Sequence, residues 1–147
     1  MAPEQRLKSF QTEAIISVVD DDESVRKSLK RLLKSIGFET KAFPSALEFL
    51  SNGPLHAYGC AIIDVRMPGM NGLELQSRLL ASGIKVPLIF ITAHDDTTAR
   101  QQAMESGAIA FLQKPFSDLS LREAISVALE KVKGFTGGEC KGMDKLD

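Results

Sequence analysis

Short apolar runs alternate with amphipathic helical segments along most of the 147-residue chain, an order that few folds accommodate. Strand-like runs occur at 14–19, 38–42, 59–63, 86–91 and 109–112. Segments with the apolar spacing of a helix follow them, at 23–36, 45–50, 71–83, 95–106 and 119–132. Connections of this kind suit parallel strands, and strands that are apolar throughout suit a sheet covered on both faces. The alternation therefore predicts an α/β fold with a doubly wound five-stranded parallel sheet.

Composition and charge exclude several classes of protein. Hydrophobic residues make up 44% of the chain and charged residues 25%, as in soluble globular domains. The 18 basic and 19 acidic residues give a formal net charge of −1, unlike a basic nucleic-acid-binding domain. The apolar runs are too short to span a membrane, and the first residues lack the apolar core of a signal peptide. Cys60 and Cys140 form neither a disulfide framework nor a zinc motif, which favours a reducing cytoplasm. Taken together, these features predict a cytoplasmic protein without membrane or direct nucleic-acid contacts.

The chain is expected to form one domain with a short segment at each end. Residues 13–133 carry the alternating pattern, and 1–12 are expected to be a flexible N-terminal segment. From residue 134 onward glycine and lysine replace the apolar pattern, which indicates that 134–147 are a flexible tail or the start of a linker. Within the domain, Asn71 is predicted to cap the helix at 71–83, and Gly37, Gly83 and Gly107 are predicted to end three helices, this one among them.

Side chains with carboxylate, hydroxyl or amino groups lie within three residues of the ends of four predicted strands: Asp20, Asp21, Asp22, Asp64, Thr92 and Lys114. The carboxyl ends of parallel strands meet at one edge of the sheet, where such folds place their ligands. Clustered carboxylates suit Mg²⁺, and an aspartate beside Mg²⁺ can form an aspartyl phosphate. Phosphoryl transfer needs positioning and charge neutralisation, which a metal, a hydroxyl and a lysine can supply.

Each of these residues also has a purely structural explanation. The run of three aspartates resembles a solvated loop that ends in a helix cap, and Asp64 resembles a turn residue before Met-Pro-Gly. Thr92 could simply lead into a helix, and Lys114 and His94 could be ordinary surface residues. The joint placement of four such groups after successive strands favours a functional site at one edge.

Four segments resemble, in order, motifs of the response-regulator receiver domains of two-component signalling. They are VVDDDESVRKSL (18–29), IIDVRMPGMNGLEL (62–75), LIFITAH (88–94) and AFLQKPF (110–116). The resemblance covers residues 15–132, and its details are similar to FixJ-type receivers. It implies the CheY-like or flavodoxin-like (βα)5 fold, with strand order 2-1-3-4-5.

The resemblance also implies a phosphoacceptor site. Asp64 would accept a phosphoryl group from the phosphohistidine of a sensor histidine kinase or phosphotransferase. The implied cofactor is Mg²⁺, held directly by Asp21 and Asp64, by Asp20 mainly through water, and by the backbone carbonyl of Arg66.

Further residues match the parts of the family that sense the phosphoryl group. Thr92 would bond a phosphoryl oxygen, and Lys114 would contact Asp64 or the phosphoryl group. The Lys114–Pro115 bond is expected to be cis. Arg66 and His94 match positions that tune dephosphorylation.

The implied switch involves an aromatic side chain. Phe111 matches the aromatic residue that turns inward when Thr92 moves; this residue is often tyrosine, so here the switch relies on packing. Segment 95–106 has few large apolar residues, which predicts an element that moves readily. This segment, the strand of Phe111 and the last helix are expected to form the surface that controls a partner or output domain, with homodimerisation on phosphorylation.

Three readings of the function follow. The first is a phosphoacceptor signalling module that is not primarily an enzyme, although it assists its own phosphorylation and hydrolyses its own phosphoaspartate. The alternative is a haloacid-dehalogenase-type phosphatase with Asp20 as nucleophile and Asp22 completing a D-x-D spacing. It is disfavoured because no acidic residue follows a predicted strand beyond Lys114. A receiver cut from a longer transcription factor and a single-domain regulator both remain open.

Overall fold

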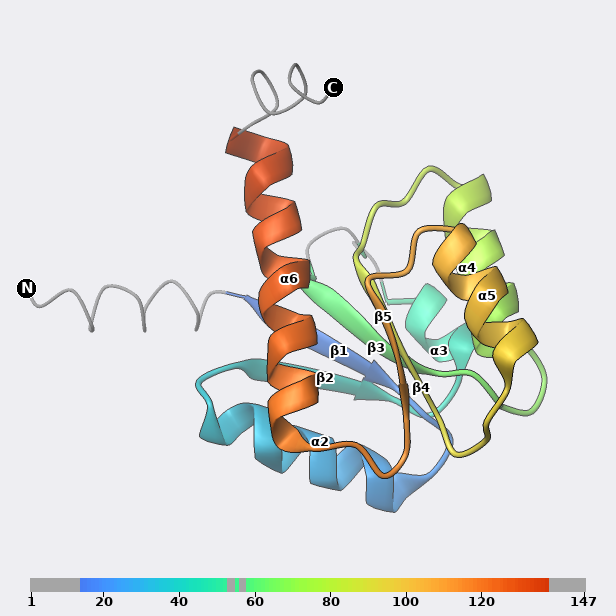
Figure 1. Ribbon diagram of the computed structural model, residues 1–147, viewed down its shortest axis with the longest axis horizontal. Helices are drawn as coiled ribbons and strands as arrows, with labels where there is room; N and C mark the ends of the chain where they lie inside the picture. Colours follow the sequence, from blue (N-terminus) through green and yellow to red (C-terminus); the bar gives the residue numbers. More distant parts are fainter. Residues whose placement is uncertain (1–13, 53–54, 56–57, 138–147) are drawn as a thin grey trace, which may run out of the picture.

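The computed structural model describes residues 14–52, 55 and 58–137 of the chain. Strands and helices alternate through this part of the protein (Figure 1). The strands are β1 (Ile15–Val19), β2 (Glu39–Phe43), β3 (Cys60–Asp64), β4 (Leu88–Thr92) and β5 (Ala110–Gln113). The helices are α2 (Glu23–Ser35), α3 (Ala46–Leu50), α4 (Gly72–Ala81), α5 (Thr97–Glu105) and α6 (Asp118–Gly137).

The five strands form one parallel sheet in the order β2-β1-β3-β4-β5. Figure 1 shows α2 and α6 on one face of this sheet and α3, α4 and α5 on the other. The predicted doubly wound sheet and its strand order are thereby confirmed. The order reverses between β1 and β3, and the carboxyl ends of these neighbouring strands border the crevice where such folds place their ligands.

Two apolar cores hold the layers together, one on each face of the sheet. Alternate residues of each strand enter opposite cores, so Ile62 packs toward α2 and α6 while Ile63 packs toward α3, α4 and α5. β3 and β4 are buried along their whole length, which explains their continuous apolar sequence. Cys60 lies in this core as a small apolar residue, as the sequence suggests, and burial raises the pKa of its thiol to about 12.

Local sequence signals account for the helix ends. Asn71 caps α4 in a capping box, in which its side chain accepts from the backbone N–H of Glu74 and the Glu74 side chain accepts from the N–H of Asn71. Gly37, Gly83 and Gly107 follow three helices in the left-handed conformation that glycine adopts readily. The predicted cap and the three predicted terminators are confirmed.

The last helix differs from its prediction. α6 continues to Gly137, five residues beyond the predicted end at Val132, so the predicted boundary at 133/134 falls inside a helix. A single glycine costs a helix only about 1 kcal/mol, and no proline stands here to stop it. The predicted segment 1–12 and residues 138–147, with Cys140, lie outside the described residues. Among the described helices, none combines the length and the apolar character needed to cross a membrane.

Candidate functional site

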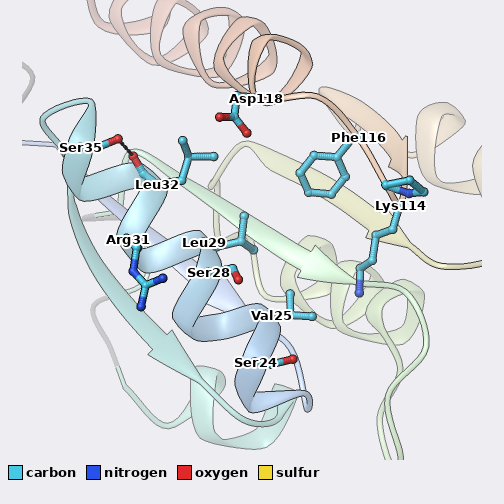
Figure 2. A pocket seen from close by; sticks show the side chains of 11 residues that line it. Ser24, Val25, Ser28, Leu29, Arg31, Leu32, Ser35, Lys114, Phe116 and Asp118 are labelled. Carbon is cyan, nitrogen blue, oxygen red and sulfur yellow. Dashed lines mark hydrogen bonds between the residues drawn. The ribbon is translucent and has the colours of Figure 1, made fainter.

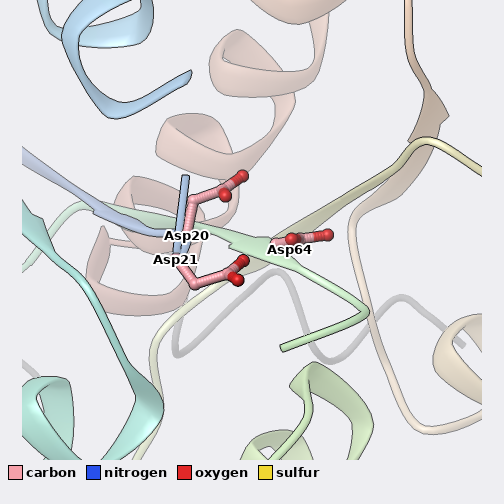
Figure 3. Close-up of side chains that lie close together, drawn as sticks. All are labelled: Asp20, Asp21 and Asp64. Carbon is pink, nitrogen blue, oxygen red and sulfur yellow. The ribbon is translucent and has the colours of Figure 1, made fainter. Parts of the chain in front are cut away.

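The register of the sheet brings the predicted site residues to one edge. Val19 pairs with Ile63 and Asp64 pairs with Ile91, so Asp20 and Thr92 directly follow residues that lie beside the end of β3. Thr92 pairs in turn with Gln113, the residue before Lys114. Figure 3 shows the carboxylates of Asp20, Asp21 and Asp64 gathered at this edge.

The three carboxylates form an acidic cluster with the composition of a cation site. Each of Asp20, Asp21 and Asp64 offers a carboxylate oxygen, and these oxygens lie within 4.8 Å of one another. Asp20 is fully buried and Asp64 is only 7% exposed, whereas Asp21 is exposed to solvent. Hard oxygen ligands that keep one open side suit Mg²⁺, which retains several waters. The residues therefore fit the ion that the sequence implies.

Asp20 is held by hydrogen bonds from three directions. Its Oδ1 accepts from the backbone N–H of Asp22 at 2.9 Å, and its Oδ2 pairs with Lys114 Nζ at 3.3 Å. Its backbone carbonyl accepts from Arg26 Nη1 at 2.7 Å. Asp22 itself caps α2 by accepting from the N–H of Ser24. The helix-cap explanation is thus correct for Asp22, while Asp20 and Asp21 belong to the cluster.

Lys114 contacts a carboxylate of the acidic cluster, although its predicted contacts were Asp64 or a phosphoryl group. Its ammonium pairs with Asp20, and no ion pair joins it to Asp64 among the described residues. Lys114 lies directly before a cis peptide bond to Pro115. Figure 2 shows its side chain at one end of a cavity of about 570 Å³ between α2 and the segment that joins β5 to α6.

Asp64 occupies an electrostatically unfavourable position. Burial, followed by the neighbouring charge of Asp20, raises its pKa from 3.8 to about 6, while Lys114 and the backbone N–H of Arg66 oppose the rise. A raised carboxyl pKa means that folding disfavours the charged form. The contribution of Asp64 to stability is therefore greatest below its unfolded pKa and falls as the pH rises toward 6. A bound cation would relieve this repulsion.

The remaining predicted residues surround this cluster. Thr92 is fully buried, and its Oγ1 accepts from the backbone N–H of His94 at 3.1 Å. His94 is exposed, in agreement with its interpretation as a surface residue. Phe111 is 6% exposed, with its ring centroid 6.3 Å from that of Phe90. Arg66 points its guanidinium to Asp96 at 3.3 Å.

Several residues important to the site do not stand out in the sequence. Gly72 packs against the backbone of Asp64, and its N–H donates to the carbonyl of Val65 at 2.9 Å. Asp96 caps α5 by accepting from the N–H of Ala99, which a capping rule could have found. Arg26 and Arg100 carry no local signal, because their partners lie on other elements.

Known proteins match this chain over most of its length. The model of the response regulator receiver domain family matches residues 16–126. Nodulation protein W from Bradyrhizobium diazoefficiens is 44% identical over 82% of this chain and 53% of that protein. Full-length FixJ from B. japonicum has a TM-score of 0.81 at 38% identity, over 90% of this chain and 66% of that one. A response regulator receiver protein from Burkholderia phymatum has a TM-score of 0.67 at 45% identity, over 78% of this chain and 94% of that one.

The matches cover most of this chain but only part of its curated relatives. The chain spans about half the length of the first curated relatives that it matches, with 53%, 54% and 50% of their residues aligned. The matched region contains the whole sheet except the first residue of β1, together with the acidic cluster at its edge. The chain belongs to the response regulator receiver domain family of two-component signalling and has the phosphoacceptor signalling role of that family.

Proposed function

We propose that Asp64 accepts a phosphoryl group from the phosphohistidine of a sensor histidine kinase or phosphotransferase. The observation that carries this proposal is the position of its carboxylate, at the end of β3 and beside two further carboxylates. In the transfer, an oxygen of Asp64 forms a bond to phosphorus as the phosphorus–nitrogen bond breaks, and the imidazole leaves with the electron pair. The family membership of the chain supports this direction of transfer.

In this proposal Mg²⁺ would be held by the carboxylates of Asp20, Asp21 and Asp64 and by the backbone carbonyl of Arg66. When bound, this ion supplies positive charge against the phosphoryl oxygens. The protein supplies the rest: Lys114, anchored on Asp20, adds a second positive charge, and the hydroxyl of Thr92 donates to a phosphoryl oxygen. Arg66 and His94 flank the site and would tune how readily water reaches the phosphoaspartate. In this proposal the domain assists the phosphorylation and the hydrolysis of its own aspartate and does not turn over a separate substrate.

The proposed output is a change in the surface made by α5, β5 and α6. Thr92 leads from β4 into the loop before α5, and α5 packs beside Phe111 of β5. Movement of Thr92 toward a phosphoryl group would therefore shift α5 and hold the ring of Phe111 inward. The altered surface would control a partner or output domain, with homodimerisation as one mode, in the cytoplasm and without direct nucleic-acid contact by this domain.

The phosphatase alternative has no support from the comparisons. It requires Asp20 as the nucleophile, yet both carboxylate oxygens of Asp20 are engaged and the residue is fully buried. Asp64 is slightly exposed at the open edge, which favours it as the attacking group.

Binding of Mg²⁺ should stabilise the folded protein, because the carboxylates converge only on folding. At about a hundredfold excess over the dissociation constant, the free energy of unfolding should rise by about 2.7 kcal/mol. Protons compete for Asp64, whose pKa is about 6, so the gain should be larger above this pH than below it. Urea denaturation with Mg²⁺ or EDTA measures it, with Asp95→Asn as a control outside the cluster. Equal stability under both conditions would contradict the metal site.

Phosphorylation by acetyl phosphate tests the proposed acceptor directly. In the presence of Mg²⁺, the intact mass should increase by one phosphoryl group, and EDTA should prevent this increase. Borohydride reduction followed by peptide mapping should place the modification on Asp64. A modification mapped to Asp20, or labelling that is indifferent to Mg²⁺, would reject the assignment.

A further inference from the structure

Helix α5 is weakly anchored by apolar contacts. Of its nine residues only Ala99 and Ala103 are buried, and its largest apolar side chain, Met104, is 43% exposed. Two buried methyl groups remove little apolar area from water, so polar contacts must contribute much of what orients this helix. One of them joins α4 to the second half of α5, where Gln76 Nε2 donates to the carbonyl of Ala103 at 3.1 Å.

The first turn of α5 is tied to the loop that follows the acidic cluster. Asp96 uses one carboxylate oxygen to cap the helix, accepting from the N–H of Ala99 at 3.0 Å. Its other oxygen pairs with Arg66 Nη2 at 3.3 Å. The backbone N–H of Arg66 in turn donates to Asp64 Oδ1 at 3.3 Å. The start of α5 is thereby connected to the proposed phosphoacceptor through two residues.

The second turn of α5 is tied to Phe111. The Cζ atom of Arg100 lies 5.0 Å from the centroid of the Phe111 ring, within the range of a cation–π contact. Arg100 Nη1 also donates to the backbone carbonyl of Phe111 at 3.4 Å. The ring has no hydroxyl with which to make a hydrogen bond of its own, and it packs near Phe90. Arg100 therefore contacts both the ring and the backbone of this residue, from another element.

We propose that Arg100 is the positioning residue that couples α5 to Phe111, and that α5 thereby connects the Arg66–Asp96 pair beside Asp64 to β5. Arg100 favours the buried position of the ring, because the ring cannot leave it without losing the guanidinium contact. This inference rests on the proposed function, in which phosphorylation of Asp64 holds the ring inward. A ligand that favours the buried ring must bind more tightly when Arg100 also favours it.

The test uses beryllofluoride with Mg²⁺ as a phosphoryl analogue. Its affinity is measured by titration, and the Phe111 ring is followed by ¹⁹F NMR of fluorophenylalanine-labelled protein, with Phe111→Leu identifying the resonance. Arg100→Met keeps an unbranched apolar side chain but removes the charge. It should weaken beryllofluoride binding by about two- to fivefold, the range of a partly exposed cation–π contact, and reduce the ligand-induced shift of the Phe111 resonance.

Two further variants separate coupling from simple helix stability. Arg100→Lys restores the charge without the planar group and should recover part of the affinity. Gln101→Met changes the neighbouring exposed residue of the same helix and should behave as the parent. The affinity for Mg²⁺ alone should be the same in all four proteins, because Arg100 does not contact the carboxylates.

The outcomes distinguish the two proposals. An Arg100→Met protein that binds beryllofluoride as tightly as the parent, or more tightly, with the same Phe111 shift, overturns the role of Arg100 and leaves the phosphoacceptor assignment intact. A parent protein that takes neither beryllofluoride nor a phosphoryl group from acetyl phosphate overturns that assignment and this inference with it.

Discussion

Replacing Asp64 with asparagine should abolish phosphorylation by acetyl phosphate while the protein remains folded. The amide of asparagine is a poor nucleophile, and the substitution also removes one carboxylate from the proposed Mg²⁺ site. The rate of labelling should therefore fall on the order of a thousandfold or more. Folding should not suffer, because the charged carboxylate is disfavoured in the native state, where its pKa is about 6. Without Mg²⁺ and above this pH, the variant should be at least as stable as the parent. Intact-mass spectrometry and urea denaturation measure the two effects.

Two matched variants allow this experiment to decide whether Asp64 or Asp20 accepts the phosphoryl group. Asp95→Asn removes an exposed acid of the nearby loop and should leave labelling unchanged. Asp20→Asn should slow labelling, because Asp20 holds Lys114 and contributes to the cluster, and added Mg²⁺ should restore part of the rate. A label that persists in Asp64→Asn and disappears in Asp20→Asn would instead favour the phosphatase alternative.

Replacing Gly72 with alanine should destabilise the protein and disturb Asp64 together. A Cβ atom at this position would lie 2.5 Å from the backbone oxygen of Asp64 and 3.0 Å from the Cα of Val65. These are backbone atoms that cannot rotate away, so either α4 or the end of β3 must move. Overpacking of this kind costs about 1–3 kcal/mol, even though alanine is the better helix former. Denaturation in urea should show this loss, and labelling by acetyl phosphate should slow because its acceptor is displaced.

A second glycine provides the control for this substitution. A Cβ atom on Gly59 would lie 2.8 Å from Cδ2 of Leu129, the end of a flexible side chain. Since Leu129 can adjust its rotamer, Gly59→Ala should cost less than Gly72→Ala and should leave labelling unchanged. Equal stability of the two variants, or normal labelling of Gly72→Ala, would show that the close approach of residue 72 to the backbone of Asp64 does not limit the side chain allowed at this position.

The order of elements and the edge that carries the polar groups could be predicted because both follow from local patterns. Apolar runs of strand length and helices of 3.6-residue period specify which segments form which element. The parallel topology then places whatever follows each strand at the same edge, which is why Asp20, Asp64, Thr92 and Lys114 could be grouped before their distances were known. Capping residues and glycines marked several helix ends correctly, but Gly134 did not end α6, because one glycine costs a helix too little to stop it.

The sequence by itself determined the sheet, its two helical layers and the set of polar residues at its edge, since periodicity and chain order suffice for these. Only the tertiary structure decided that Lys114 pairs with Asp20, that Gly72 meets the backbone of Asp64, and that Arg100 covers Phe111. Each of these contacts joins separate segments of the chain: the ion pair of Lys114 with Asp20 is 3.3 Å long, and Arg100 Cζ lies 5.0 Å from the centroid of the Phe111 ring. Such distances depend on strand register, helix packing and rotamers, which no local pattern of residues specifies.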